Sequence, residues 1–277
     1  MDISIIRNVA LISHGGAGKT SLSEAILFNA KITKRLGDIE NGTSVMDYDP
    51  VEIARKLSTN IKVATVDWNR YHLNIIDTPG YANFLHEAKT ALSAVSGAVV
   101  LASAITGVKA ETERVWGYAN EFSLARLIFI NKMDKERADF YHAMADVEKV
   151  FNIKPLPLYL PIGAYETFKG VIDLIKMKAL IYPNDATAAY TEHEIPAELL
   201  DEAKRYHERL VETVSETDDA LIEKYLDTGD LSEEELINGI REGAITKKFV
   251  PVLCGSATKN IGAKLLLEAI IKYLPSP

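Results

Sequence analysis

The sequence predicts an α/β fold, a mostly parallel sheet with helices on both faces, plus an inserted α+β subdomain. Short apolar runs alternate with segments of helical periodicity, which is typical of parallel sheets whose strands are joined by helices. A glycine-rich turn at residues 13–20 lies between an apolar run and an amphipathic segment, as in phosphate-binding loops. Residues 157–245 have a pattern of their own. We therefore expect a main domain, residues 1–156 and 246–277, interrupted by a subdomain at 157–245.

The elements of the main domain are expected at its apolar and amphipathic segments. Strands are predicted over residues 9–12, 61–68, 72–76, 98–102, 127–130 and 250–254, and helices over 20–29, 83–96, 110–122, 139–150 and 263–273. Asn69 and Arg70 form a hairpin turn signal, so one antiparallel edge pair is expected. The polar residues 31–60 show no sustained periodicity and are predicted to be a mobile loop after the first helix.

The subdomain is expected to begin with a small sheet and to continue with helices. Residues 156–181 are apolar in short runs separated by proline and glycine, and helical patterns follow over 198–215, 218–225 and 232–242. Ser232 and Glu235 have the spacing of a capping box, which marks the start of the last of these helices.

Composition narrows the class of protein. The 277 residues are 47% hydrophobic and 25% charged, as in ordinary globular proteins. The single cysteine, Cys254, excludes a disulfide framework and favours a reducing compartment, so we expect a cytoplasmic protein. No secretory signal opens the chain. The uncharged stretch between Lys89 and Lys109 contains serine and glycine and is interpreted as a buried strand with no membrane contact.

The net charge of −8 is unevenly distributed. Residues 191–242 carry 17 acidic and 5 basic side chains, a net of −12, so the rest of the chain has a net of +4. This distribution does not favour a general nucleic-acid-binding surface, and no DNA partner is expected. The acidic segment can attract a basic partner, repel a phosphate backbone or simply form a solvated helical face.

The glycine-rich turn predicts a phosphate site. Backbone N–H groups at such a turn converge at a helix N-terminus and bind phosphate. Lys19 can reach β- and γ-phosphates, and the Thr20 hydroxyl can hold Mg²⁺. The residues expected to bind here are Ser13, His14, Gly15, Gly16, Ala17, Gly18, Lys19, Thr20 and Ser21. Ser13 stands where the pattern has its first glycine. A dinucleotide-binding interpretation is weaker, because Ser21 stands where a third glycine is needed.

A second motif, Asp77-Thr78-Pro79-Gly80, follows the apolar run that ends at Ile76. An aspartate at such a strand end can hold Mg²⁺ through water, and the Gly80 N–H can contact a γ-phosphate. Because that contact requires the γ-phosphate, the following segment can order with triphosphate and relax after hydrolysis. An ordinary proline–glycine turn explains the same residues.

Two further motifs predict the base. Asn131-Lys132-Met133-Asp134 follows the apolar run that ends at Ile130, and a carboxylate there can accept hydrogen bonds from guanine N1–H and the 2-amino group. Adenine lacks this donor pair and is rejected by such a site. Lys132 can cover the base and Asn131 can tie loops together. The second motif, Ser256, Ala257 and Thr258, follows the strand ending at Cys254, and its Ala257 N–H can meet guanine O6. The alternative for Asn131–Asp134 is a polar turn that caps the next helix.

With these motifs in order, the chain resembles the GTP-binding domain of translational GTPases, and within them elongation factor G, which has the P-loop GTPase fold. The resemblance is carried by Asn131–Asp134 running into Ala138-Asp139-Phe140, and by residues 158–164, 170–174, 253–260 and 273–277. In this family an inserted subdomain fills the gap that residues 157–245 occupy here. The family's chain continues beyond the Pro-Ser-Pro end, so further C-terminal domains are expected.

The resemblance implies a GTPase that binds GTP or GDP with Mg²⁺ and switches conformation on the ribosome. Implied partners of the full-length protein are large-subunit RNA and a stalk protein, the latter at the acidic segment, and we expect a monomer. Lys19 supplies charge, and Tyr81 stands where the family has a histidine that positions the attacking water. The Mg²⁺ ligands implied are Thr20, Ser58 and Asp77, with Thr59 the alternative to Ser58.

Several residues depart from the family pattern. Gly16 replaces an aspartate, and Lys56-Leu57-Ser58 after Arg55 replaces an arginine–glycine–isoleucine–threonine run. Tyr81 replaces the family's histidine and cannot become cationic near neutral pH. In this respect the chain resembles the divergent second form of elongation factor G more than the housekeeping form. Three alternatives stay open: a nucleotide-gated binding module with negligible hydrolysis, a ribosomal-protection-type GTPase and an ATP-dependent kinase. His14 and His86 are interpreted as satisfied polar positions.

Overall fold

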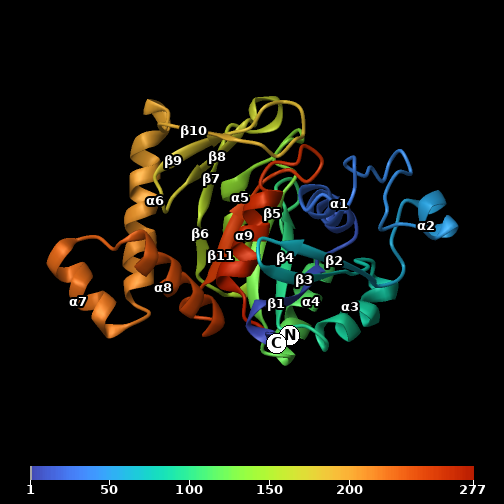
Figure 1. The fold of residues 1–277 in the computed structure, drawn as a ribbon, viewed down its shortest axis with the longest axis horizontal. Coiled ribbons are helices and arrows are strands. Elements are labelled where there is room, and N and C mark those ends of the chain that lie inside the picture. The colour runs from blue at the N-terminus through green and yellow to red at the C-terminus, as the bar shows by residue number, and fades with distance from the viewer. Residues whose placement is uncertain (1) are drawn as a thin grey trace.

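The computed structural model describes residues 2–277 and has a seven-stranded central sheet (Figure 1). Its order is β2-β3-β1-β4-β5-β11-β6. The strands are β1 (Ile6–Ile12), β2 (Lys62–Trp68), β3 (Tyr71–Asp77), β4 (Gly97–Ser103), β5 (Ala125–Asn131), β6 (Pro155–Pro157) and β11 (Val250–Cys254). Every neighbouring pair is parallel except β2 and β3, which confirms the predicted antiparallel edge hairpin.

Helices connect these strands and cover the sheet. The longer ones are α1 (Lys19–Asn29), α3 (Leu85–Leu92), α4 (Ala110–Glu121), α5 (Phe140–Phe151) and α9 (Ala263–Tyr273). Helix α1 contacts α9, whereas α4 contacts both α3 and α5, and Figure 1 shows α9 in front of the sheet. Short 3₁₀ turns occur at Ile3–Ile5, Ala82–Phe84 and Tyr165–Thr167.

The core follows the central strands. All residues of β4, β5 and β11 are buried, because strands in the middle of a parallel sheet are covered on both faces. The strand within the uncharged stretch between Lys89 and Lys109 is therefore core, as predicted. Within residues 2–277, every helix falls short of the length and apolar character needed to cross a membrane.

A second, antiparallel sheet with its own helices lies between β6 and β11 in the chain. Its order is β10-β9-β8-β7, with β7 (Tyr159–Ile162), β8 (Gly170–Asp173), β9 (Lys178–Ile181) and β10 (Thr191–His193). Helices α6 (Ala197–Ser215), α7 (Asp219–Thr228) and α8 (Glu233–Ile245) follow and lie on the left in Figure 1. This is the α+β insertion that the sequence predicts.

The structure corrects two expected elements. The helix predicted over 83–96 is limited to Leu85–Leu92, because the Ser96 N–H donates to Asn8 O at 3.2 Å and the chain enters β4 at the next residue. The loop predicted over 31–60 contains a short helix, α2 (Pro50–Arg55), which the Asp49 side chain caps. Its six residues are too few to produce a helical period.

Candidate functional site

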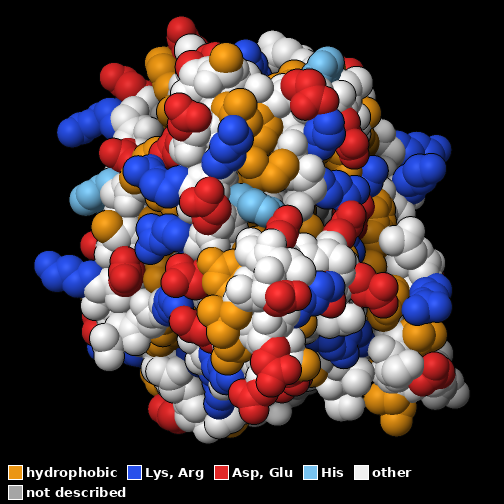
Figure 2. Space-filling model, turned by 90° about the vertical axis from the view of Figure 1, so that its left-hand side faces the viewer, with side chains coloured by type: hydrophobic (Ala, Val, Ile, Leu, Met, Phe, Trp, Pro, Cys, Tyr) orange, Lys and Arg blue, Asp and Glu red, His pale blue; other side chains and the backbone are white. Residues whose placement is uncertain are grey.

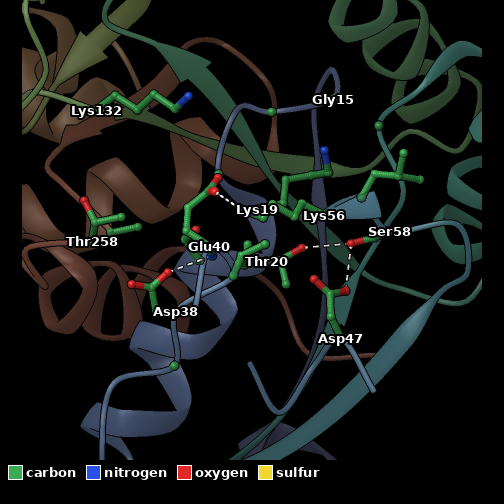
Figure 3. A pocket seen from close by; sticks show the side chains of 18 of the residues that line it. Gly15, Lys19, Thr20, Asp38, Glu40, Asp47, Lys56, Ser58, Lys132 and Thr258 are labelled. Carbon is green, nitrogen blue, oxygen red and sulfur yellow. Dashed lines mark hydrogen bonds and ion pairs between the residues drawn. The ribbon is translucent and has the colours of Figure 1, made fainter. Parts of the chain in front are cut away.

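The four predicted motifs meet at one edge of the central sheet. They follow β1, β3, β5 and β11, and parallel strands end at the same edge. A cavity of about 430 Å³ opens there (Figure 3). It is lined by Gly15, Gly16, Gly18, Lys19, Thr20, Ser21, Leu36, Gly37, Asp38, Ile39, Glu40, Asp47, Lys56, Leu57, Ser58, Thr78, Gly80, Tyr81, Lys132, Lys135, Ala257 and Thr258.

The glycine-rich turn leads into α1 through a left-handed residue. Gly18 is the N-cap with φ 97°, and no side chain caps the helix, so its first amides remain available to an anion. The Lys19 ammonium is buried and donates to the carbonyl oxygens of Ser13 at 3.1 Å and His14 at 2.9 Å. Burial lowers the pKa of Lys19 to about 8. The turn thus holds a cation whose present partners are backbone carbonyls.

Oxygen atoms from three segments converge beside this lysine. The Thr20 hydroxyl donates to Asp77 Oδ2 at 2.7 Å and lies 3.1 Å from Ser58 Oγ. Ser58 donates to Asp47 Oδ1 at 3.1 Å (Figure 3). Asp77 is buried, its Oδ1 has no hydrogen-bond partner, and burial raises its pKa to about 6.

Hydroxyl and carboxylate oxygens are ligands that suit Mg²⁺. The unpartnered Asp77 oxygen also requires a partner, so this set fits the ion. Within residues 2–277, no group of three or more histidine, cysteine or acidic side chains could hold a metal. The candidate site at Thr20, Ser58 and Asp77 combines two hydroxyls with one carboxylate. Thr59 is less suitable than Ser58, because its hydroxyl donates to Glu52 Oε1 at 3.0 Å.

Gly80 approaches the glycine-rich turn very closely. A Cβ atom there would lie 2.5 Å from the carbonyl carbon of His14 and would clash with the Lys19 ammonium. Thr78, two residues earlier, donates to Leu11 O at 2.7 Å and fixes the start of this turn. Pro79 occupies the position between them. The neighbouring Tyr81 is 44% exposed, and its ring leaves no room for a Cβ at Gly15, which would be 2.7 Å from Cζ.

Asn131 links the two sides of the site, as predicted. Its amide donates to Ala17 O at 2.9 Å, and its Oδ1 accepts from the Ala257 N–H at 3.0 Å. The sequence predicts that the Ala257 N–H meets guanine O6, but a base would compete with Asn131 for this donor. Met133 is buried, and its N–H donates to Gly255 O at 3.2 Å.

Asp134 presents an unsatisfied carboxylate oxygen. Its Oδ1 is buried without a hydrogen-bond partner, while Oδ2 lies 3.4 Å from Thr258 Oγ1 and 3.1 Å from Lys135 Nζ. The Ser256 hydroxyl accepts from the Lys259 N–H at 3.1 Å and shapes the facing loop. A buried acceptor without a donor is costly, so the site fits a ligand that brings N–H groups.

Sequence reasoning missed part of the cavity wall. Residues 36–40, Asp47 and Lys56 line it but lie in the segment expected to be a mobile loop. Lys56 has φ 53° and its ammonium pairs with Glu40. A left-handed residue is a natural glycine position, but the sequence has a lysine there, so no local signal marks this turn. His14 is buried and lies 2.8 Å from Thr112 Oγ1, and burial lowers its pKa to about 4, as expected of a satisfied polar position.

Comparison with known proteins agrees with this geometry. Residues 4–276 match the family described as elongation factor Tu GTP binding domain. The fold also matches a crystal structure from Thermus thermophilus with a TM-score of 0.91 and 34% sequence identity. That match covers 99% of this chain and 41% of the Thermus chain, so the chain spans less than half the length of that relative.

Proposed function

This chain belongs to the elongation factor Tu GTP binding domain family, and from that premise we propose that it is the nucleotide-hydrolysing part of an elongation factor G-like protein. We assign GTP-binding to residues 1–156 and 246–277, and an inserted subdomain to 157–245. The observation that carries the proposal is the unpartnered Asp134 oxygen, which lies at the same sheet edge as the glycine-rich turn. Phosphates on the turn and a guanine at Asp134 would occupy one site.

The chemistry asked of the chain is positioning and charge neutralisation. Lys19 would exchange its carbonyl partners for the β- and γ-phosphates, and the Gly80 N–H would contact the γ-phosphate. Thr20, Ser58 and Asp77 would hold Mg²⁺, which when bound supplies further positive charge to the phosphates. The other residues of the four motifs (13–21, 77–80, 131–134 and 256–258) would donate backbone N–H groups to the nucleotide or form the walls of its site.

Tyr81 would take the place of the residue that positions the attacking water. Its ring already packs against Gly15 of the phosphate loop, and a phenol, unlike an imidazole, does not become a cation by taking up a proton. This residue, with Gly16 and Lys56, supports the assignment to the divergent second form of elongation factor G. It would order a water by hydrogen bonding alone.

Base selection tests the proposal directly. We would measure displacement of a fluorescent GDP by GTP, ATP and XTP. The wild type should reject ATP by about 10⁴-fold, because adenine leaves the buried carboxylate unpaired. Asp134→Asn should shift preference towards xanthine nucleotide. Asp139→Asn is the matched control, since Asp139 only caps α5 through the His142 N–H and asparagine also caps helices.

Equal competition by ATP would overturn the proposal and favour an ATP-dependent kinase. An unchanged preference in Asp134→Asn would remove Asp134 from the base site. If Asp139→Asn also lost its preference for guanine, the change in nucleotide displacement would reflect disturbed folding and not contact with the base.

A second candidate is a nucleotide-gated ribosome-binding module with negligible hydrolysis, and Tyr81 is the observation that favours it. Single-turnover hydrolysis by the longer protein on ribosomes separates the two. If the wild type gives no hydrolysis and Tyr81→His restores it, the binding module is correct. Measurable wild-type hydrolysis supports the enzyme.

The proposed partners are the large ribosomal subunit RNA and a stalk protein, with the protein acting in the cytoplasm as a monomer. The side of the molecule that carries α6 and α7 shows acidic side chains interspersed with lysine and arginine (Figure 2). Acidic groups there can steer a basic partner. Charge reversal within residues 198–216 should weaken capture of the stalk protein, and unaffected capture would argue against this surface.

A further inference from the structure

One buried lysine outside the predicted motifs joins the segment at residues 31–60 to the central sheet. Lys62 begins the edge strand β2, and its side chain is 3% exposed. Its ammonium lies 2.7 Å from Asp47 Oδ1 and 2.6 Å from Glu52 Oε2. Burial lowers the pKa of Lys62, but hydrogen bonds to these two carboxylates outweigh burial and raise it. The lysine is therefore a charged anchor for two acidic residues of the segment.

The carboxylates of Asp47 and Glu52 also accept hydrogen bonds from Ser58 and Thr59, at the cavity end of the segment. Asp47 Oδ1 accepts from Ser58 Oγ at 3.1 Å, and Ser58 lies 3.1 Å from Thr20 Oγ1. Glu52 Oε1 accepts from the backbone N–H of Thr59 at 2.6 Å. Lys62 is thus linked to Ser58 through Asp47. Through Glu52 it is also linked to Thr59, the chain neighbour of Ser58.

Polar contacts, more than apolar packing, hold this segment in place. Val45, Tyr48, Val51 and Ile53 are exposed. Glu24 of α1 accepts from the N–H groups of Val45 at 2.7 Å and Met46 at 2.8 Å. A segment with few buried apolar contacts opens at low free energy, so loss of one buried charge should change its position.

We propose that Lys62, through Asp47 and Glu52, positions Ser58 against Thr20 and thereby favours binding of the triphosphate over the diphosphate. The inference rests on the proposed function. It adds that the Lys62 ammonium holds residues 31–60 against the proposed γ-phosphate position. Lys62 also offsets the negative charge of a third acid, Asp77. Without the Lys62 ammonium, Asp47 and Glu52 would be buried charges without a cation. The segment would then swing towards water and withdraw Ser58.

Nucleotide titrations separate positioning from folding. We would compare wild type, Lys62→Met, Lys62→Arg and the control Lys178→Met. Lys178 is also a strand lysine paired with a glutamate, Glu194, but it lies in the second sheet. Fluorescent GDP would be titrated in EDTA, and a fluorescent non-hydrolysable GTP analogue in Mg²⁺.

Lys62→Met should bind the analogue about tenfold more weakly or worse, because breaking the buried pair would release Asp47 and, with it, Ser58 from the cavity. Its GDP affinity in EDTA should stay within about twofold of wild type, because the groups that would bind the diphosphate lie on the glycine-rich turn. Lys62→Arg should recover most of the analogue affinity, and Lys178→Met should match the wild type. A folded Lys62→Met that discriminates like the wild type would overturn the inference.

A second variant covers the case in which Lys62→Met does not fold. Glu52→Gln keeps an acceptor for the Thr59 N–H but removes one charge from the network. It should show a smaller loss of analogue affinity in the same direction, and a folded Glu52→Gln with full discrimination would also overturn the inference.

Trypsin gives an independent readout at Arg35, Arg55 and Lys56. The analogue should slow cleavage there in the wild type but not in Lys62→Met, and equal protection of both would contradict the inference. If the wild type selects guanine but does not distinguish triphosphate from diphosphate, the inference fails and the proposed base site stands. If the wild type does not select guanine, the proposed function itself fails.

Discussion

The site leaves no room for a side chain at Gly80, and we predict that Gly80→Ala reduces GTP hydrolysis. A Cβ would collide with the His14 carbonyl carbon, at 2.5 Å, and with the Lys19 ammonium. The turn must therefore move away from Lys19 and from the proposed γ-phosphate position. A displaced donor of this kind should lower the single-turnover rate by about 10–100-fold, given that loss of one preorganised donor costs up to about 10³.

The matched control is Gly117→Ala in α4, where nothing lies within 4 Å of an added Cβ. There alanine should raise the free energy of unfolding by about 0.5–1 kcal/mol, because glycine is entropically unfavourable in a helix. Its hydrolysis rate should match the wild type. Unchanged hydrolysis in Gly80→Ala would show that the turn is not close to the reacting phosphate.

Asp77 should make stability depend on pH in the absence of nucleotide and metal. Burial raises its pKa from 3.8 to about 6, so the folded protein holds this proton more tightly than the unfolded chain does. The free energy of unfolding should therefore fall as the pH rises from about 4 to about 6, by about 2–3 kcal/mol in total, and stay level above that window.

Asp77→Asn should lack this slope. Urea unfolding of the wild type and Asp77→Asn in EDTA at several pH values measures the difference between their free energies of unfolding. The contributions of the other carboxylates are the same in both proteins and cancel in this difference. A difference that is independent of pH would mean that the pKa of Asp77 is the same in the folded and unfolded protein. Binding of Mg²⁺ with nucleotide should also weaken below about pH 6, because the cation requires the ionised carboxylate.

Regular elements follow local signals, and the sequence predicts them well for that reason. Strand β11 (Val250–Cys254) and helix α9 (Ala263–Tyr273) have the bounds that the apolar pattern indicates. The site motifs are also predictable, because each follows an apolar strand and parallel strands share an edge. The arrangement of residues 31–60 is different. Asp47 and Glu52 meet Lys62 only in the folded chain, and no local period encodes a contact between polar residues so far apart.

Helix α8 shows how much one local signal contributes. Ser232 and Glu235 form the predicted capping box, with the Ser232 N–H donating to Glu235 Oε2 at 2.8 Å. Ser232→Ala should lower the free energy of unfolding by about 1 kcal/mol, because the first amides of the helix lose their acceptor. Thermal and urea unfolding would measure the change. Nucleotide affinity is the internal control and should not change, since α8 does not line the cavity; an unchanged stability would argue that water replaces the cap.

The two sheets are connected at the loops proposed to contact the base. The Tyr165 N–H, from the insertion, donates to Met133 O at 2.8 Å. Asn260 is fully buried and donates to Ala186 O at 3.0 Å and to Asn29 Oδ1 at 3.2 Å. The insertion therefore contacts both base-side loops through its backbone groups, and Asn260 extends these contacts to α1 through an amide pair.

The chain as a whole should turn over GTP slowly. The groups proposed for catalysis supply charge and position, but within residues 2–277 the arginine side chains are absent from the cavity lining. Comparable GTPases hydrolyse at about 10⁻⁴–10⁻² s⁻¹ without or with an internal arginine, and we expect a single-turnover rate in this range, measured by phosphate release. The match covers 41% of the Thermus chain, and under the proposed function ribosomes should stimulate a protein of that length and leave this chain near its basal rate. Fast multiple turnover by the chain alone would contradict this expectation, since it would require a catalytic cation or base beyond those that line the cavity.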